Sequence, residues 1–200
     1  MGQYYKTIIK IDTEIEDRII KIDNDCFEFS HGLKLMEHSW LGSEWADLLA
    51  LQLYNQTCRV AEVGDYADEF PLHSVAHREQ FNRHIKSAKG LETLMKDGNW
   101  VGFDYKDKYL VNLDAKLYID FNSYMEKCKD SYGYIVSPMN LLTAQGNGRG
   151  GGDYHNCYPC FDLVGKWAWD LICIKDEKPE GFEEFQVIFK EEVEEDDDNV

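Results

Sequence analysis

Long apolar stretches are missing from this chain of 200 residues, and their absence limits where the protein works. No stretch approaches the roughly 20 consecutive apolar residues of a membrane-spanning helix. The first residues, MGQYYKTIIK, lack the apolar core of a secretory signal peptide, and Lys6 stands where a myristoylation motif requires Ser or Thr. We therefore expect a cytoplasmic protein with no membrane partner.

Several motifs with known chemistry are also missing. No Gly-x-Ser-x-Gly elbow occurs, which disfavours a serine hydrolase, and no Gly-Lys-Ser/Thr completes a Walker phosphate loop. The six cysteines are scattered and no secretory signal accompanies them, so they indicate reduced thiols rather than disulfides. His155, Cys157 and Cys160 have the spacing H-x-C-x-x-C, but without a second cysteine pair this predicts ordinary thiols. We expect no bound metal and no cofactor.

Basic residues are few relative to acidic ones. The chain has 38 acidic and 21 basic residues and a net charge of −17. Seven of the acids lie in the last ten residues, 191–200, which contain no base, so the rest of the chain carries a net charge of −10. Such a surface repels nucleic acid and favours basic partners, although the same charge also serves solubility alone.

Alternation of polar and apolar residues predicts paired strands over 4–11 and 17–22. Leucines at helical spacing behind Ser43 predict an amphipathic helix over 43–56, followed by a strand over 59–63. Similar patterns predict a helix over 74–89, a hairpin over 108–113 and 115–120, a short helix over 121–130, and strands over 167–174 and 183–189 joined by a turn.

Strands at both ends with helices between them favour an α+β fold. We expect one domain over 1–190 with a mainly antiparallel sheet and two or three helices, then a disordered acidic tail over 191–200.

The segment 146–152 is the most unusual local feature, with five glycines among seven residues. It matches G-x-G-x-x-G, but that dinucleotide fingerprint requires a helix to follow, and DYHNCYPC predicts none. What remains is a backbone that can approach a ligand closely and present amides and one guanidinium to an anion. A plain packing loop is the alternative. The candidate ligand-binding residues are Asn147, Gly148, Arg149, Gly150 and Gly151.

Carboxylic acids and histidines provide candidates for catalysis. Asp153 and His155 directly follow the glycine-rich segment, and Asp65 belongs to the acidic stretch GDYADEF. Paired carboxylates hold magnesium or act as acid and base when the fold brings them together, with His155 or His38 as a proton carrier. Solvated surface carboxylates are the alternative in so acidic a chain.

Four blocks of sequence carry a resemblance: MGQYY, GLKLMEHSW, GDYADE, and GNGRGGGDY followed by GKWAWD. With these the chain resembles a group of short uncharacterised proteins encoded by phages, prophages and other bacterial mobile elements. The resemblance spans most of the chain and implies a setting rather than a reaction. Small acidic proteins from such elements resemble inhibitors of host defence, including anti-CRISPR proteins, some of which present carboxylates in place of phosphates.

Two hypotheses of function follow. The first is a phage-type interaction protein that inhibits a host defence nuclease through an acidic surface. Its partner is a basic, nucleic-acid-binding protein of the bacterial cytoplasm, and it binds no DNA directly. The alternative is an enzyme, a nuclease or hydrolase that acts on a nucleotide or nucleic acid at the glycine-rich segment, with a divalent metal as its cofactor.

Overall fold

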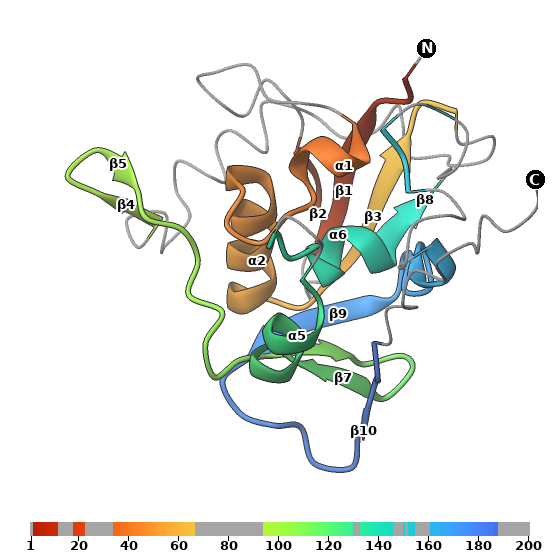
Figure 1. Ribbon diagram of the computed structural model, residues 1–200. Coiled ribbons are helices and arrows are strands. Elements are labelled where there is room, and N and C mark those ends of the chain that lie inside the picture. Colours follow the sequence, from red (N-terminus) through yellow and green to blue (C-terminus); the bar gives the residue numbers. More distant parts are fainter. Residues whose placement is uncertain are drawn as a thin grey trace, which may run out of the picture.

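One eight-stranded sheet organises the computed structural model, which describes residues 2–11, 18–22, 34–66, 94–129, 133–145, 150, 152–154 and 161–187 (Figure 1). Its strands are β1 (Tyr5–Ile11), β2 (Arg18–Ile22), β3 (Cys58–Gly64), β6 (Tyr109–Asn112), β7 (Leu117–Asp120), β8 (Ala144–Gln145), β9 (Leu171–Lys175) and β10 (Glu183–Glu184). A separate hairpin consists of β4 (Met95–Lys96) and β5 (Asn99–Trp100). The described helices are α1 (Leu35–His38), α2 (Glu44–Asn55), α5 (Phe121–Lys127) and α6 (Pro138–Thr143), with a 3-10 turn over Phe161–Leu163.

The sheet is mainly antiparallel. Its strand order is β10-β7-β6-β9-β3-β1-β2, and only the pairs β10–β7 and β3–β8 are parallel among the described strands. One edge of β3 is shared, because β9 pairs with its first residues and β8 with its last. The mixture of helices with this sheet confirms the predicted α+β class.

Several elements follow directly from local sequence. β1 and β2 pair as the alternation predicts, and β6 and β7 form the expected hairpin. α2 begins behind Ser43, whose side chain accepts a hydrogen bond from the Ala46 N–H at 3.1 Å. This bond satisfies one of the N–H groups that a helix start leaves open.

The strands expected over 167–174 and 183–189 are shorter than predicted and are not neighbours in the sheet. β9 lies between β6 and β3, so both of its edges are occupied. β10 instead pairs with β7, the nearest strand with an open edge. The helix predicted over 74–89 and the acidic tail over 191–200 lie outside the described residues.

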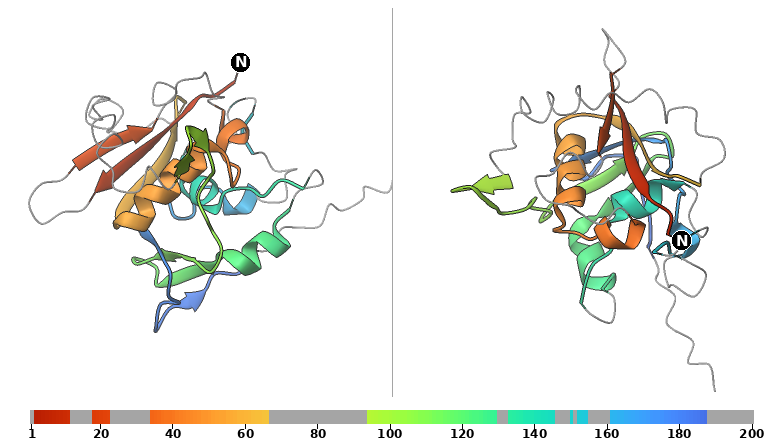
Figure 2. Two further views of the ribbon diagram at one scale, coloured as in Figure 1. Left: turned by 90° about the vertical axis from the view of Figure 1, so that its left-hand side faces the viewer. Right: turned by 90° about the horizontal axis from the view of Figure 1, so that it is seen from above.

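Apolar side chains on one side of the sheet form the main core. α1, α2 and α6 lie together on that side, against β1, β3 and β9 (Figures 1 and 2). Trp45, Leu49 and Leu53 of α2 are at most 1% exposed within this core. On the other side, Val111, Tyr118 and Cys173 form a smaller cluster.

Three cysteines lie within the described residues, and all are free and buried. Burial raises the pKa of the Cys58 and Cys128 thiols to about 12, and it also raises the pKa of Cys173. These thiols are therefore protonated and unreactive at neutral pH. No helix within the described ranges is long and apolar enough to cross a membrane.

Asp47 anchors the chain that leads from the β4–β5 hairpin, which projects from the body in Figure 1. The side chain is 0% exposed, and its Oδ1 accepts hydrogen bonds from the Tyr105 hydroxyl at 2.7 Å and from the Gly42 N–H at 3.2 Å. Its Oδ2 accepts from Trp100 Nε1 at 3.3 Å. Burial raises the pKa of Asp47 and outweighs the lowering effect of these hydrogen bonds.

The raised pKa of Asp47 predicts a pH-dependent effect of Asp47→Asn. A carboxyl whose pKa is higher in the folded state stabilises that state when protonated, and this contribution is lost as pH rises through the folded-state pKa. Because Asn does not ionise, we expect the variant to gain stability relative to wild type between about pH 4 and about pH 7. Urea unfolding of both proteins measures this. Asp104→Asn, at an exposed position, is the control, and a stability difference that is the same at both pH values contradicts the prediction.

Candidate functional site

A carboxyl group lies in the interior at Glu62, on β3, where it is 0% exposed. Its Oε1 accepts hydrogen bonds from Thr7 Oγ1 of β1 and from Asn140 Nδ2 of α6, both at 2.6 Å. Thr7 and Glu62 are opposite each other in the β1–β3 register, so their side chains point to the same side of the sheet. Three elements thus meet at one buried polar group.

His38, the last residue of α1, faces the second oxygen of that carboxyl group. Its Nε2 lies 3.5 Å from Glu62 Oε2, and the side chain is 2% exposed. The imidazole stacks on Trp45 with ring centroids 4.3 Å apart and an interplanar angle of 23°. Trp45 Nε1 also donates to Thr7 Oγ1 at 2.7 Å, so one indole positions both the histidine and the threonine.

The His38–Glu62 pair is incompletely satisfied. Neither ring nitrogen of His38, nor Glu62 Oε2, makes a hydrogen bond within the described part of the chain. Leaving a buried polar atom without a hydrogen bond costs about 1–3 kcal/mol. Native proteins bury few such groups, and each one calls for an explanation, such as a catalytic role.

Gln3 connects this cluster to the end of the glycine-rich segment. Its Nε2 donates to Asp153 Oδ2 at 2.6 Å and to the Tyr5 hydroxyl at 2.9 Å. Its Oε1 accepts from the Tyr66 N–H at 3.1 Å, and Asp153 Oδ2 also accepts from the Gly150 N–H at 3.3 Å. One carboxamide therefore joins β1, the turn after β3 and the segment around Asp153.

Tyr5 lies between the two groups of polar residues. Burial, followed by the charge of Asp153 and a hydrogen bond to it, raises the pKa of the Tyr5 hydroxyl far above its usual range. Glu62 and Asp65 add smaller effects in the same direction. The phenol therefore stays protonated and donates its single proton to Asp153.

Two glycines make room for Gln3. A Cβ atom on Gly64 would collide with the Gln3 side-chain amide, and one on Gly150 would collide with the Gln3 backbone nitrogen. Real Cβ atoms do not approach other atoms so closely. Both positions thus require glycine because of close packing.

α1 is attached to the end of the same segment. The Met36 N–H donates to the Gly152 carbonyl at 2.9 Å. The hydroxyls of Ser39 and Tyr154 are 2.9 Å apart, and both side chains are 0% exposed. The helix turn that carries His38 is therefore bonded to residues at the end of the glycine-rich segment.

The structure brings together some of the predicted site residues. Asp153 and Gly150 contact each other and Gln3, and His38 lies in the adjoining cluster. Asp65 is exposed at the end of β3, where its Oδ1 accepts a hydrogen bond from the Tyr4 N–H at 3.1 Å. No group of three or more His, Cys, Asp or Glu side chains within the described ranges is arranged to hold a metal ion. The other predicted residues, Asn147, Gly148, Arg149, Gly151 and His155, lie outside the described residues.

Sequence reasoning missed Glu62, Gln3, Thr7 and Asn140. The sequence does carry a signal for Glu62, because this acid occupies the same face of its strand as the buried Val60. An acid at an inward-facing strand position is costly unless it is paired. Gln3 and Asn140 offer no such signal in their own neighbourhoods.

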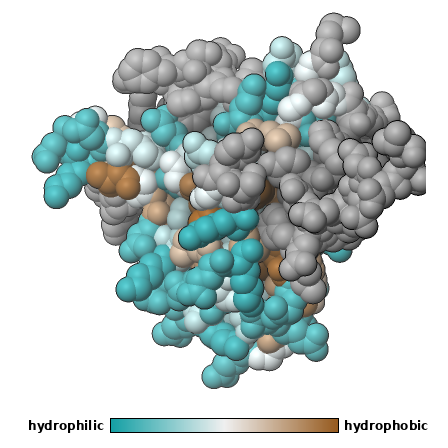
Figure 3. All heavy atoms as spheres, viewed as in Figure 1, coloured by the Kyte–Doolittle hydropathy of each residue, from teal (hydrophilic) through white to brown (hydrophobic). Residues whose placement is uncertain are grey.

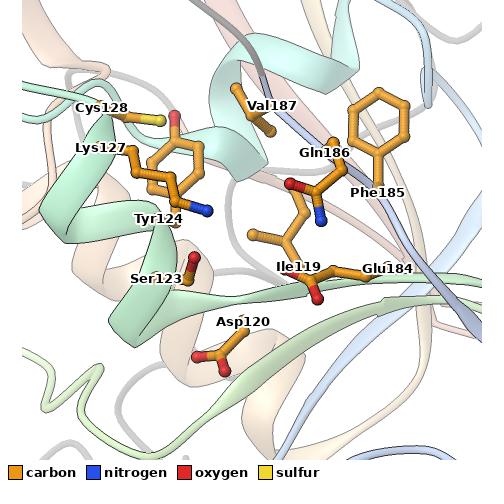
Figure 4. Close-up of a pocket in the computed structure, with 10 residues that line it drawn as sticks. All are labelled: Ile119, Asp120, Ser123, Tyr124, Lys127, Cys128, Glu184, Phe185, Gln186 and Val187. Atoms are coloured by element: carbon orange, nitrogen blue, oxygen red, sulfur yellow. The ribbon is translucent and has the colours of Figure 1, made fainter.

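A surface hollow lies elsewhere, between α5 and the chain that follows β10 (Figure 4). Asp120, Lys127 and Glu184 contribute its charged side chains. The hollow belongs to the β7–β10 end of the sheet, whereas Glu62 lies on β3. None of the predicted site residues within the described ranges lines it, so the cluster around His38 and Glu62 is the candidate site.

Comparisons with known proteins place the chain in no family, because no family model, no curated protein and no solved structure matches it.

The packing of Gln3 predicts a coupled effect on stability. We expect Gly64→Ala to lower the free energy of unfolding by roughly 1–3 kcal/mol, because the new methyl group overpacks the site. In a Gln3→Ala background the same substitution costs little, since the colliding side chain is gone. Urea unfolding of the four proteins in this double-mutant cycle measures the coupling. An equal cost of Gly64→Ala in both backgrounds contradicts this account of the glycine.

Proposed function

We propose that this protein is an enzyme that acts on a nucleotide or nucleic acid, with His38 and Glu62 as its proton-transfer pair. The observation that supports the proposal is the buried pair itself. Three of its polar atoms make no hydrogen bond within the described part of the chain, and the pair lies beside the end of the glycine-rich segment. The sequence of that segment contains five glycines and Arg149, residue types that suit the phosphate of such a substrate.

Each group in the cluster has a role in this proposal. Two hydrogen bonds hold Glu62 Oε1, so Oε2 is directed to His38 and stabilises the imidazolium that forms when the ring accepts a proton. Stacking on Trp45 fixes the plane of the ring. His38 thus acts as the general base that activates water or a hydroxyl group.

Substrate reaches the pair only after a local opening, because His38 is 2% and Glu62 0% exposed. α1 is the shortest described helix at the site, with four residues. A single turn has little stability of its own and depends on its tertiary contacts. We propose that displacement of this turn admits the substrate.

The proposal predicts loss of turnover in Glu62→Gln and His38→Asn. The amide introduced by Glu62→Gln keeps a carbonyl oxygen for Thr7 and Asn140 but removes the charge that faces the histidine. We expect rates about 100- to 10,000-fold below wild type, the usual effect of losing a general base. The measurement is release of phosphate or nucleotide from a panel of nucleoside phosphates, cyclic nucleotides, RNA and single-stranded DNA.

Asp47→Asn is the matched control, because it neutralises another buried carboxyl group outside the cluster. We expect it to keep wild-type turnover. Thermal unfolding verifies that all variants are folded. Wild-type rates in a folded Glu62→Gln protein, or no turnover of any substrate by wild type, would sink the proposal.

A second proposal rests on where the acidic residues lie. The described part of the chain holds 19 of the 38 acidic and 15 of the 21 basic residues, so little of the net charge of −17 belongs to it. Figure 3 shows a largely hydrophilic surface over the part of the molecule where α5, β6 and β7 lie in Figure 1. This end of the sheet carries residues of both signs, as in the pair Lys108–Asp176. The acidic segment 191–200 is therefore the part best suited to occupy a basic groove.

In this second proposal the protein is a phage-type interaction protein that inhibits a basic host nuclease of the bacterial cytoplasm. A variant with Asn and Gln in place of the acids of 191–200 is expected to lose the partner. Capture from host lysate at about 50 mM and about 500 mM salt, with both proteins as bait, measures this. Equal capture by the neutral variant at low salt contradicts a role for the segment.

A further inference from the structure

The position of His38 depends on contacts from outside its own helix. α1 is one turn long, and Trp40 Nε1 donates back to the Met36 carbonyl at its end. Backbone bonds hold the turn on two sides, from Met36 N–H to the Gly152 carbonyl and from Ser137 N–H to the Ser39 carbonyl. The residue after His38 adds a side-chain contact, the bond between Ser39 and Tyr154.

The direction of that bond can be assigned. Ser39 has a single hydroxyl proton, and its Oγ donates to the Leu35 carbonyl at 2.5 Å. The Tyr154 hydroxyl is therefore the donor to Ser39 Oγ. When Tyr154→Phe removes this bond, the serine proton is still bonded to Leu35, so the variant leaves no unsatisfied donor on Ser39.

Tyr154 belongs to a short segment with a second attachment. Its neighbour Asp153 is bonded to Gly150 and to Gln3. Gln3 lies two residues before the start of β1, the strand from which Thr7 donates to Glu62. The segment thus contacts the helix turn of His38 at one end and the chain leading to the partner of Glu62 at the other.

We infer that Tyr154 is a positioning residue that sets the place of His38 against Glu62 and transmits to this pair any shift of residues 152–154. A ligand that moves the segment therefore changes the His38–Glu62 separation, which is 3.5 Å in this structure. The kinetic part of this inference rests on the proposed enzymatic function, whereas its structural part does not.

The structural part is tested by proton–carbon NMR of the histidine rings. The Trp45 ring stacks 4.3 Å from the imidazole, so its ring current makes the His38 signal sensitive to small displacements. The signal is assigned by its loss in His38→Asn. We expect it to move in Tyr154→Phe and to stay at the wild-type position in Tyr118→Phe. Tyr118 is a matched control because it is also buried but lies on β7.

An unmoved His38 signal in folded Tyr154→Phe overturns the inference. In the kinetic part, we expect kcat of Tyr154→Phe to be about 10- to 100-fold lower with KM unchanged, the pattern of a displaced base. A raised KM with unchanged kcat instead assigns Tyr154 to substrate binding and overturns the positioning role. If wild type has no turnover but the signal moves, the positioning role stands and the proposed enzymatic function fails.

Discussion

Burial of Glu62 is the constraint on which the arrangement of the interior depends. A carboxyl group removed from water must be paired, or it destabilises the fold. Thr7 of β1, Asn140 of α6 and His38 of α1 each approach it, so three separate parts of the chain are held in register by one side chain. The hydrogen bond from Asn140 to Glu62 adds to the apolar packing that holds α6 over β3.

Gln3 serves a similar purpose for the segments at the end of the sheet. Its carboxamide uses both of its polar atoms, and two glycines permit its close approach. Hydrogen bonds of this kind contribute modestly each, yet leaving their partners unsatisfied in the interior is costly. The polar groups around Gln3 and those around Glu62 therefore lie next to each other in the interior, with Tyr5 between them.

Local sequence predicts the elements that depend on local patterns. α2 and the pairs β1–β2 and β6–β7 follow from periodicity and a capping serine. The two-residue strand β8 carries no such pattern, and the alternation over 183–189 predicts a longer strand than β10. Both short strands form where another strand offers an open edge. The same holds for the site. Asp153 can be picked out from the sequence because it follows the glycines, whereas the pairs Thr7–Glu62 and Gln3–Asp153 join residues 55 and 150 positions apart. Contacts at that separation are set by the tertiary fold.

The reactivity of the three buried thiols reports where the fold opens. Cys58 and Cys173 lie on β3 and β9 in the middle of the sheet, whereas Cys128 follows α5 near one end. A thiol that is both covered and protonated reacts with an alkylating reagent only while its surroundings are open. The alkylation rates of Cys58 and Cys173 therefore measure opening of the sheet, whereas the rate of Cys128 measures opening around α5. No engineered cysteine is needed.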